Sequence, residues 1–311
     1  MEYELPQGLQ ELLTEQYGGE TAEMIVQGFM QPRRVTLRVN TIKTSVDAAR
    51  AQLEAAGVAL TPVAWSDEAF IVENVREHAL EQLPLYENGD IYLQSLSSML
   101  PPLLLEPQAG ECILDMAAAP GGKTTQMAAL SGNRALITAC EMHKIRAQRL
   151  EYNVKKQGAS RVNVMVTDSR RLDDLFQFDK ILLDAPCSGS GTILYTDKGF
   201  TGGFSRALMD KCARTQEEML RKALRLLKPG HEMVYSTCSI LQRENEAILQ
   251  RVLKNGAAQV VPFDEARFAD VPKLPTSMEG ALLVRPTQLY EGFFAVRLRK
   301  SGEAKKSKRL R

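Results

Sequence analysis

The segment ECILDMAAAPGGKTT, residues 111–125, combines an apolar run, a turn of alanines and glycines, and the first residues of a predicted helix. The apolar run, residues 112–116, predicts a buried strand, and residues 123–132 predict the start of a helix. Small residues in the turn allow backbone N–H groups to approach a ligand, and the positive end of the helix dipole lies beside them. The spacing matches neither GxxxxGK[ST] nor GxGxxG, which disfavours a phosphate loop and a dinucleotide site. We therefore expect a cofactor turn of another kind, with a tight turn that binds nothing as the alternative.

The alternation of short apolar runs and helical segments continues towards the end of the chain. The predicted strands after this turn lie at 134–141, 163–168, 180–186, 232–238 and 291–300. Buried strands that alternate with helices predict an α/β fold with a mostly parallel, doubly wound sheet. In such a sheet, ligands bind at the edge where the carboxyl ends of the strands meet.

Acidic residues follow successive predicted strands. Glu141 ends the second strand of this series, where a carboxylate can accept hydrogen bonds from both ribose hydroxyls of a nucleoside. Asp168 ends the third strand, where it can meet an adenine amino group. Acids in these places, without a pyrophosphate loop, favour an adenosyl cofactor. S-adenosylmethionine fits, because its cationic groups tolerate neighbouring carboxylates.

Two cysteines follow strand ends in unusual contexts. Cys187 lies in KILLDAPCSGSG (residues 180–191), and Cys238 lies in EMVYSTCSILQRENE (residues 232–246). A thiolate can add to carbon-6 of a pyrimidine and make carbon-5 nucleophilic. The addition also needs an acid that protonates or hydrogen-bonds N3 of the base, and Asp184 is the candidate. A second thiol or base could then help to remove the carbon-5 proton and release the first thiol.

The remaining cysteines and the histidines indicate no metal site. Five cysteines without a CxxC pair argue against zinc, and the odd number argues against a disulfide framework. Three of them lie within predicted strands or helices and are expected to be core residues: Cys112, Cys140 and Cys212. Three histidines share no metal-type spacing and are expected at the surface: His78, His143 and His231. Reduced thiols, no signal-like N-terminus and no apolar run of about 20 residues predict a cytoplasmic protein.

Composition and charge suit a globular protein of two domains. The chain has 311 residues, of which 44% are hydrophobic and 25% charged, and its net charge is +1. The predicted parts are an N-terminal α/β domain at 1–90, a larger domain at 91–300 and a basic tail at 301–311.

Basic residues are concentrated at the end of the sequence, where residues 297–311 include eight basic residues and one acid. We expect the following basic residues to contact RNA phosphates: Arg33, Arg34, Arg38 and the tail from Lys305. A solvated terminus is the alternative for the tail.

Six segments together resemble the RNA cytosine-5 methyltransferases of the NOL1/NOP2/Sun type, nearest to the bacterial ribosomal-RNA members. These segments are RVNT (38–41), YLQSLSSMLP (92–101), DMAAAPGGKTTQMA (115–128), DAPCSGSG (184–191), YSTCSILQRENE (235–246) and EGFFAVRLRK (291–300). The resemblance covers about residues 30–300. Its DAPCSG and STCS motifs are highly specific, whereas the Gly-Gly turn alone is not.

The resemblance implies a Rossmann-like class I methyltransferase domain with a mostly parallel seven-stranded sheet whose last strand is antiparallel. It also implies a smaller, RRM-like RNA-contacting domain before it, and we expect a monomer. In the family, the position of Cys238 is the nucleophile and that of Cys187 assists product release. The positions of Lys123 and Asp184 help to hold and protonate the base. The implied S-adenosylmethionine-binding residues are Ala117, Ala118, Ala119, Pro120, Gly121, Gly122, Lys123, Glu141, Arg146, Asp168 and Asp184.

Some departures and alternatives remain. Gly230-His231 replaces the usual Gly-Gly, and Glu291 stands where the family usually has aspartate. The extra C-terminal RNA-binding domain of several relatives is not present in this sequence, which leaves the RNA open. Small-subunit rRNA is the first expectation for the substrate and tRNA the second.

The alternative functions are a DNA cytosine-5 methyltransferase with Cys187 as nucleophile, and a non-catalytic RNA-binding or ribosome-assembly factor. An amino-methyltransferase is further disfavoured, because residues 184–187 read DAPC rather than [NDS]PP[YF].

Overall fold

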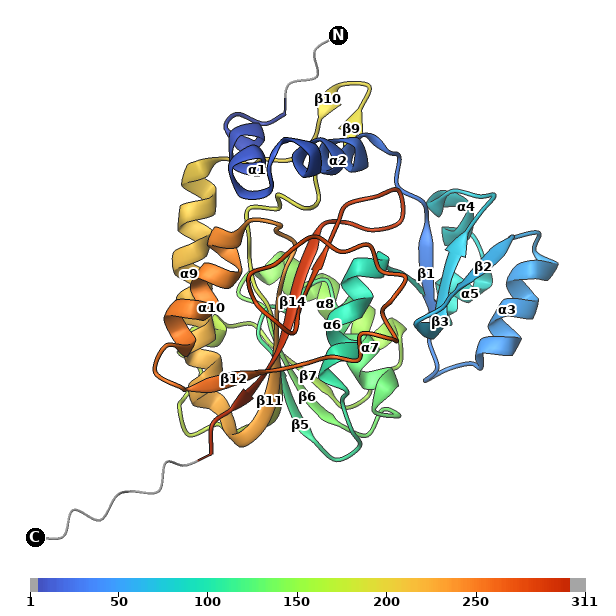
Figure 1. The fold of residues 1–311 in the computed structure, drawn as a ribbon. Helices are drawn as coiled ribbons and strands as arrows, with labels where there is room; N and C mark the ends of the chain where they lie inside the picture. The colour runs from blue at the N-terminus through green and yellow to red at the C-terminus, as the bar shows by residue number, and fades with distance from the viewer. Residues whose placement is uncertain (1–4, 303–311) are drawn as a thin grey trace, which may run out of the picture.

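A large and a small β-sheet organise the computed structural model, which describes residues 5–302 (Figure 1). The large sheet has the order β12-β14-β11-β8-β5-β6-β7, and β13 pairs with β14 outside this path. Its strands are β5 (Cys112–Asp115), β6 (Leu136–Cys140), β7 (Val162–Met165), β8 (Phe178–Asp184), β11 (Leu227–Thr237), β12 (Ala258–Val261), β13 (Ala281–Val284) and β14 (Phe293–Lys300). The strands from β11 to β7 are parallel, and β14 is antiparallel to its partners. The expected mostly parallel sheet with an antiparallel last strand is confirmed, and β13 adds an eighth strand to the expected seven.

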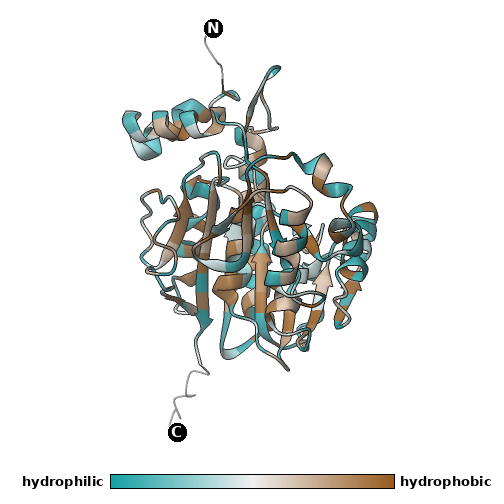
Figure 2. Cartoon of the chain, turned by 90° about the vertical axis from the view of Figure 1, so that its right-hand side faces the viewer, coloured by the Kyte–Doolittle hydropathy of each residue, from teal (hydrophilic) through white to brown (hydrophobic). Residues whose placement is uncertain are grey.

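Helices cover both faces of this sheet. They are α6 (Leu96–Leu105), α7 (Gly122–Leu130), α8 (Lys144–Lys156), α9 (Arg206–Leu226) and α10 (Glu246–Leu253). The first three share one buried cluster, which includes Met99 and Leu150, while α9 and α10 contribute Leu220 and Leu249 to another. Figure 1 shows α9 and α10 on one side of the sheet and α6 and α7 on the other. In Figure 2 the central strands are mostly hydrophobic, which is typical of strands buried between two helix layers.

Two elements differ from what the sequence predicts, which is a helix in LQSLSSMLPPLLL (93–105) interrupted at its prolines and a helix in RTQEEMLRKALRLLKPG (214–230) that ends at Pro-Gly. The sequence predicts an interruption at Pro101-Pro102, but α6 runs through both prolines. Proline removes a helical N–H donor, and the side chain of Gln94 donates instead to the carbonyl of Ser98 at 3.1 Å. The second difference is the end of α9, which stops at Leu226, so that the predicted Pro-Gly stop lies inside β11. The register of β11 with β8 is irregular there, which accommodates the proline.

The small sheet has a ferredoxin-like arrangement. Its order is β2-β3-β1-β4 and all its pairs are antiparallel. The chain order is strand, helix, strand, strand, helices, strand: β1 (Thr36–Val39), α3 (Val46–Ala55), β2 (Leu60–Val63), β3 (Ser66–Val72), α4 (Glu77–Glu81), α5 (Pro84–Asn88) and β4 (Ile91–Leu93). This confirms the RRM-like topology. The domain boundary at residue 90 remains a prediction, and we note that β4 follows it.

The N-terminal helices belong structurally to the large sheet. α1 (Leu9–Tyr17) and α2 (Gly19–Met30) place Leu9, Leu13 and Phe29 in the same buried cluster as α9. Tyr17 and Gln16 also hydrogen-bond to the carbonyl of Ile240, near the end of β11. A short hairpin, β9 (Tyr195–Thr196) and β10 (Gly199–Phe200), lies beside α2 (Figure 1).

One face of the small sheet is covered by the larger part of the protein. Arg38 is only 2% exposed and donates hydrogen bonds to Gln94 and to Thr125 of α7. Arg33 donates to two backbone carbonyls between β13 and β14, and Arg34 pairs with Glu73. The expectation that Arg38 contacts RNA phosphates is therefore wrong, because its strand face packs inside the protein. The tail from Lys305 lies outside the described residues.

Candidate active site

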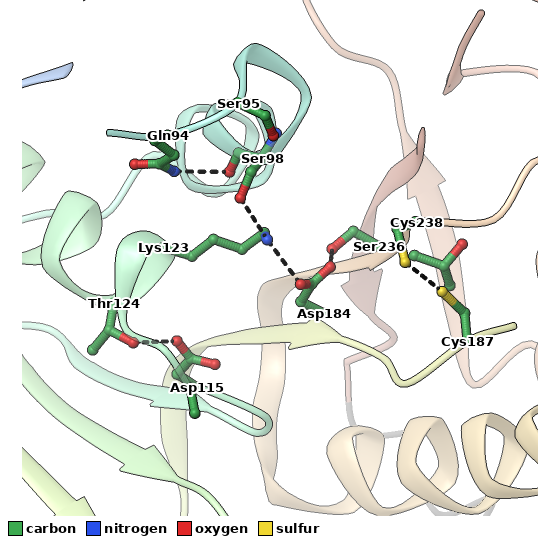
Figure 3. A network of polar contacts seen from close by, with 12 residues as sticks. Gln94, Ser95, Ser98, Asp115, Lys123, Thr124, Asp184, Cys187, Ser236 and Cys238 are labelled. Carbon is green, nitrogen blue, oxygen red and sulfur yellow. Dashed lines mark hydrogen bonds and ion pairs between the residues drawn. The ribbon is translucent and has the colours of Figure 1, made fainter. Parts of the chain in front are cut away.

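The two cysteines meet at the carboxyl ends of neighbouring parallel strands. β8 ends at Asp184, and this residue pairs with Ser236 in β11. The segments after the two strands bring Cys187 and Cys238 together, both half-buried, with their Sγ atoms 2.7 Å apart (Figure 3). The structure therefore joins two thiols that are 51 residues apart in the chain.

Backbone contacts fasten the two cysteine loops to each other and to the segment before β14. The N–H of Gly191 donates to the carbonyl of Cys238 at 2.9 Å, and the N–H of Gly292 donates to the carbonyl of Gly191 at 2.8 Å. A Cβ atom on Gly191 would lie 2.0 Å from the carbonyl oxygen of Gly292. Only glycine allows backbones to approach so closely, which explains Gly191 in the DAPCSGSG segment.

A buried carboxylate accepts hydrogen bonds from both loops that carry the thiols. Glu244, in the short helix η2 (Gln242–Glu244), is 0% exposed. Its Oε1 accepts from the N–H of Ser188 at 2.7 Å, and its Oε2 accepts from the hydroxyls of Ser188 and Ser239 at 2.5 and 2.6 Å. Ser188 and Ser239 directly follow Cys187 and Cys238, so Glu244 fixes the two loops relative to each other. The sequence prediction missed this role, although the residue lies in the quoted QRENE segment.

An ion pair and two hydroxyls surround the carboxylate beside the thiols. Lys123, at the beginning of α7, places its Nζ 2.8 Å from Oδ2 of Asp184. Ser236 donates to Oδ1 of Asp184 at 2.7 Å, and Lys123 donates to the hydroxyl of Ser98 at 2.8 Å (Figure 3). Burial lowers the pKa of Lys123, but the charge of Asp184 and the hydrogen bond to it outweigh this and raise the pKa above its ordinary value. Lys123 therefore keeps its proton beside Asp184 at neutral pH.

A second carboxylate lies beneath this pair. Asp115, the last residue of β5, is 1% exposed and accepts a hydrogen bond from Thr124 at 2.7 Å. Its other oxygen, Oδ1, is buried and has no partner among the described residues. Burial raises the pKa of Asp115 to about 6. A buried acceptor at the carboxyl end of a strand, beside a cavity wall, is a group that a bound ligand could satisfy.

Two adjoining cavities open at this edge of the sheet. One, of about 280 Å³, has a wall that contains both thiols: it is lined by Ala117, Ala119, Glu141, Arg146, Asp168, Asp184, Cys187 and Cys238 among others. The other, of about 200 Å³, is lined by the rest of the turn and the neighbouring β4–α6 segment, including Ala117, Ala118, Ala119, Pro120, Gly122, Lys123, Asp184, Gln94 and Ser98. Gly121 lines neither cavity; it turns the chain into α7 with a φ of 110°. The structure thus brings the predicted residues together around one turn.

Glu141 occupies a protected place in the larger cavity. It is 3% exposed, and its Oε1 accepts from the N–H of His143 at 2.8 Å. Arg146 approaches its Oε2 at 3.4 Å and donates to the carbonyl of Ala119 at 3.0 Å. Arg146 therefore connects α8 to the small-residue turn, and Glu141 presents a fixed negative charge to the cavity.

Asp168 also lines this cavity, but it has an intramolecular partner. Arg170 binds the carboxylate with Nε and Nη2, at distances of 2.7 to 3.1 Å. These hydrogen bonds lower the pKa of Asp168. The carboxylate therefore remains charged at neutral pH, and a ligand amino group that binds it would share it with Arg170.

Cys140 and Cys212 are buried and Cys112 is half-buried, as free cysteines in a core usually are. Within residues 5–302, no three His, Cys, Asp or Glu side chains are grouped so that they could hold a metal ion. The same range contains no helix whose length and apolar character would let it cross a bilayer.

Comparison with known proteins shows the family to which the chain belongs. Residues 102–299 match the family described as 16S rRNA methyltransferase RsmB/F, and residues 5–77 match the ferredoxin-like domain of such methyltransferases. The chain belongs to the RsmB/F methyltransferase family. The resemblance inferred from the DAPCSG and STCS motifs is thereby confirmed.

The relatives are similar over most of this chain but are longer than it. The Ribosomal RNA small subunit methyltransferase F of Cronobacter sakazakii is 37% identical over 308 residues, which cover 96% of this chain and 63% of that protein. Its counterpart in a Shewanella species is 36% identical over 278 residues, 87% of this chain and 57% of that protein. This RsmB/F-family chain therefore spans about three fifths of the length of these relatives. A crystal structure of a methyltransferase homolog protein from Pyrococcus horikoshii superposes with a TM-score of 0.81 at 31% identity, over 95% of this chain and 100% of that one.

Proposed function

We propose that this protein transfers a methyl group from S-adenosylmethionine to carbon-5 of a cytidine in RNA through a covalent adduct. The observation that carries the proposal is the pair of thiols in contact at the wall of a cavity, beside the Lys123–Asp184 pair. Ribosomal RNA is preferred to tRNA as the substrate, because the similar proteins are named small subunit rRNA methyltransferases. In this proposal residues 1–90 contact RNA, residues 91–300 carry the methyltransferase site, and 301–311 form a basic tail.

The larger cavity suits S-adenosylmethionine. Glu141 offers a buried carboxylate for ribose hydroxyls, and the turn from Ala117 to Gly122 offers small side chains and free approach to the backbone. Asp168 and Asp184 add negative charge for the cationic groups of this ligand. When bound, S-adenosylmethionine would supply an electrophilic methyl group on a sulfonium sulfur.

The contact between the two thiols affects the protonation of Cys187. The hydrogen bond with Cys238, together with burial, raises the pKa of Cys187 well above its ordinary value. Cys187 therefore keeps its proton and can donate it in a hydrogen bond to Cys238. We assign to Cys238 the thiolate that forms a bond to carbon-6 of the cytosine, as the resemblance of the STCS motif implies. The electron pair displaced from the carbon-5–carbon-6 bond then makes carbon-5 nucleophilic.

The Lys123–Asp184 pair can control charge on the base. Addition of the thiolate moves negative charge towards N3, and a proton held between Lys123 and Asp184 can be shared with N3. After methylation, carbon-5 carries both the new methyl group and its original hydrogen, and this hydrogen must leave as a proton. We assign this release to Cys187, which is in contact with Cys238. The thiol proton of Cys187 passes to the departing Cys238 sulfur, the Cys187 thiolate takes up the carbon-5 proton, and the carbon-5–carbon-6 double bond forms again.

Glu141→Ala is expected to weaken S-adenosylmethionine binding by about tenfold or more. A charge-assisted hydrogen bond contributes on the order of 1.5–3 kcal/mol, and Glu141 can make such bonds with ribose hydroxyls. Isothermal titration calorimetry measures the dissociation constant. Glu151→Ala on the exposed side of α8 is the control, and equal affinities for wild type and Glu141→Ala would remove Glu141 from the site.

Glu244→Ala is expected to lower the methylation rate by at least about tenfold, while Glu244→Gln keeps much of it. Glutamine can still bridge Ser188 and Ser239, whereas alanine removes this bridge and the acceptor for the N–H and hydroxyl of Ser188. The informative readout is the pH dependence of the reaction of Cys187 and Cys238 with a thiol reagent. A change in that profile for alanine, with recovery for glutamine, would show positioning. An unchanged profile would mean that Glu244 only stabilises the fold.

The proposed function is tested by incubating the protein with S-adenosylmethionine and small-subunit rRNA, free or assembled, and with tRNA. The RNA is then digested to nucleosides, and 5-methylcytidine is measured by mass spectrometry. We expect 5-methylcytidine in rRNA, at a site that bisulfite sequencing locates. Methylation of DNA, or of a nitrogen of the base, would contradict the proposal, as would no methylation of any of these substrates.

A further inference from the structure

The part of the small sheet around Arg38 and Tyr92 is covered by the larger part of the protein. Arg38 of β1 donates to Thr125 of α7, and Tyr92 of β4 meets Gly122 and Asn153 of the larger part of the protein. Single-stranded RNA binds RRM-type sheets by stacking on this kind of face. In this chain the flanking RNA must therefore find another surface near the thiols.

Helix α8 has an exposed face with an unusual composition. Ile145 is 73% exposed and Tyr152 is 64% exposed. Arg149 lies between them at helical spacing, so the three side chains are neighbours on one face. They border a shallow depression together with Gln148 and Asn153. Large exposed apolar and aromatic side chains beside a cation indicate a contact surface.

This helix is also basic and its charges are largely free. Lys144, Arg149 and Lys155 are exposed, and none of them forms an ion pair with any residue in 5–302. The helix has one acid, Glu151. An exposed aromatic ring among unpaired cations is the combination that binds the bases and phosphates of a single strand. An apolar protein partner would have to desolvate these cations without compensation, so a polyanion is the better match.

The position of α8 connects this face with both ends of the site. At the beginning of α8, His143 and Arg146 line the larger cavity. Further along the helix, the side chain of Asn153 donates to the carbonyl of Pro120 in the small-residue turn. At its end, Gln157 accepts from Asn40 of the small domain at 2.8 Å. The helix has 13 residues and is therefore about 20 Å long. Its exposed face thus extends from the mouth of the cavity to the small domain.

We propose that this α8 face, defined by Lys144, Ile145, Arg149, Tyr152 and Lys155, binds the single-stranded RNA that flanks the target cytidine. One base stacks on Tyr152 and packs against Ile145, while the cations meet phosphates. This inference rests on the proposed function, because it names the surface through which the same site receives its substrate.

The test measures RNA binding by fluorescence anisotropy over a series of salt concentrations. Tyr152→Ala should weaken binding of a single-stranded rRNA segment by about tenfold, and Tyr152→Phe should restore it, because stacking needs only the ring. Arg149→Ala should reduce the slope of log affinity against log salt by about 0.7. Affinity for S-adenosylmethionine, which also reports correct folding, should stay unchanged in all three variants.

Two matched variants at the opposite edge of the sheet serve as controls. Phe176 is 47% exposed and precedes β8. Lys254 follows α10, is exposed, and forms no ion pair with any residue in 5–302. Phe176→Ala and Lys254→Ala should leave RNA affinity and the salt slope unchanged. If they lose as much affinity as the α8 variants, binding is unspecific and the inference is overturned.

Other outcomes separate this inference from the proposed function. If the wild type methylates RNA and the α8 variants bind and methylate it equally well, the inference is wrong and the proposed function stands. If the variants instead lose self-association, measured by light scattering, while RNA binding persists, the face is a protein interface. If the wild type neither binds nor methylates RNA, both proposals fail.

Discussion

Cys187→Ala is expected to accumulate a protein–RNA adduct that survives denaturing gel electrophoresis, and Cys238→Ala to form none. With Cys187 absent, thiolate addition by Cys238 and methyl transfer remain possible, but release of the product is blocked. With Cys238 absent, no carbon–sulfur bond forms and methylation falls to background. The measurement uses radiolabelled RNA with S-adenosylmethionine, and the labelled band shifts to the mass of the adduct.

Cys112→Ala provides the control, because this half-buried thiol is the first residue of β5, at the end of the parallel strands opposite to the thiol pair. It should methylate RNA and leave no adduct. An adduct in Cys238→Ala and none in Cys187→Ala would reverse the two roles. Methylation by the double variant of Cys187 and Cys238 would end the covalent mechanism altogether.

Asp184→Asn is expected to reduce the methylation rate by roughly 10²–10⁴-fold, the usual contribution of a positioned acid or base. Asparagine has nearly the same shape and can still accept from Ser236. It removes the negative charge that faces Lys123 at 2.8 Å, and with it the proton shared between the two groups. Single-turnover methylation with saturating RNA isolates this step from binding.

The control for this variant lies on the same strand. Asp179, near the other end of β8, pairs with Lys228 at 2.6 Å, so Asp179→Asn removes an equivalent charge far from the thiols. It should leave the rate within about twofold, since this charge lies near the beginning of β8, at the end opposite to Asp184. A loss of less than about fivefold for Asp184→Asn would exclude Asp184 as the group that handles charge on the base.

The edge of the large sheet could be predicted because parallel strands bring their carboxyl ends together. The positions of Asp184, Cys187 and Cys238 followed from two apolar runs, one before Asp184 and Cys187 and the other before Cys238. Lys123 was found only through the family resemblance, since nothing local shows that a lysine at a helix start will reach Asp184. The contact between the two sulfur atoms depends on two loops meeting, which no spacing along the chain reveals.

Long-range packing explains what the sequence could not show. Arg38 lies in a strand with alternating polarity that suggests a solvent face, but that face packs against α7. Glu244 looks like one charge among several in a polar segment, and its burial beneath Ser188 and Ser239 appears only in the folded protein. Polar residues in tertiary interfaces carry no periodic signal, because their partners come from distant parts of the chain.

The central claim, that Cys238 attacks the cytosine, is tested most directly by locating the bond itself. The adduct formed by Cys187→Ala with RNA and S-adenosylmethionine is digested with nuclease and protease, and the nucleotide-bearing peptide is sequenced by mass spectrometry. We predict a methylated cytidine nucleotide bonded to Cys238. A nucleotide on any other residue, or an adduct formed equally well after Cys238 is also replaced, would contradict the claim.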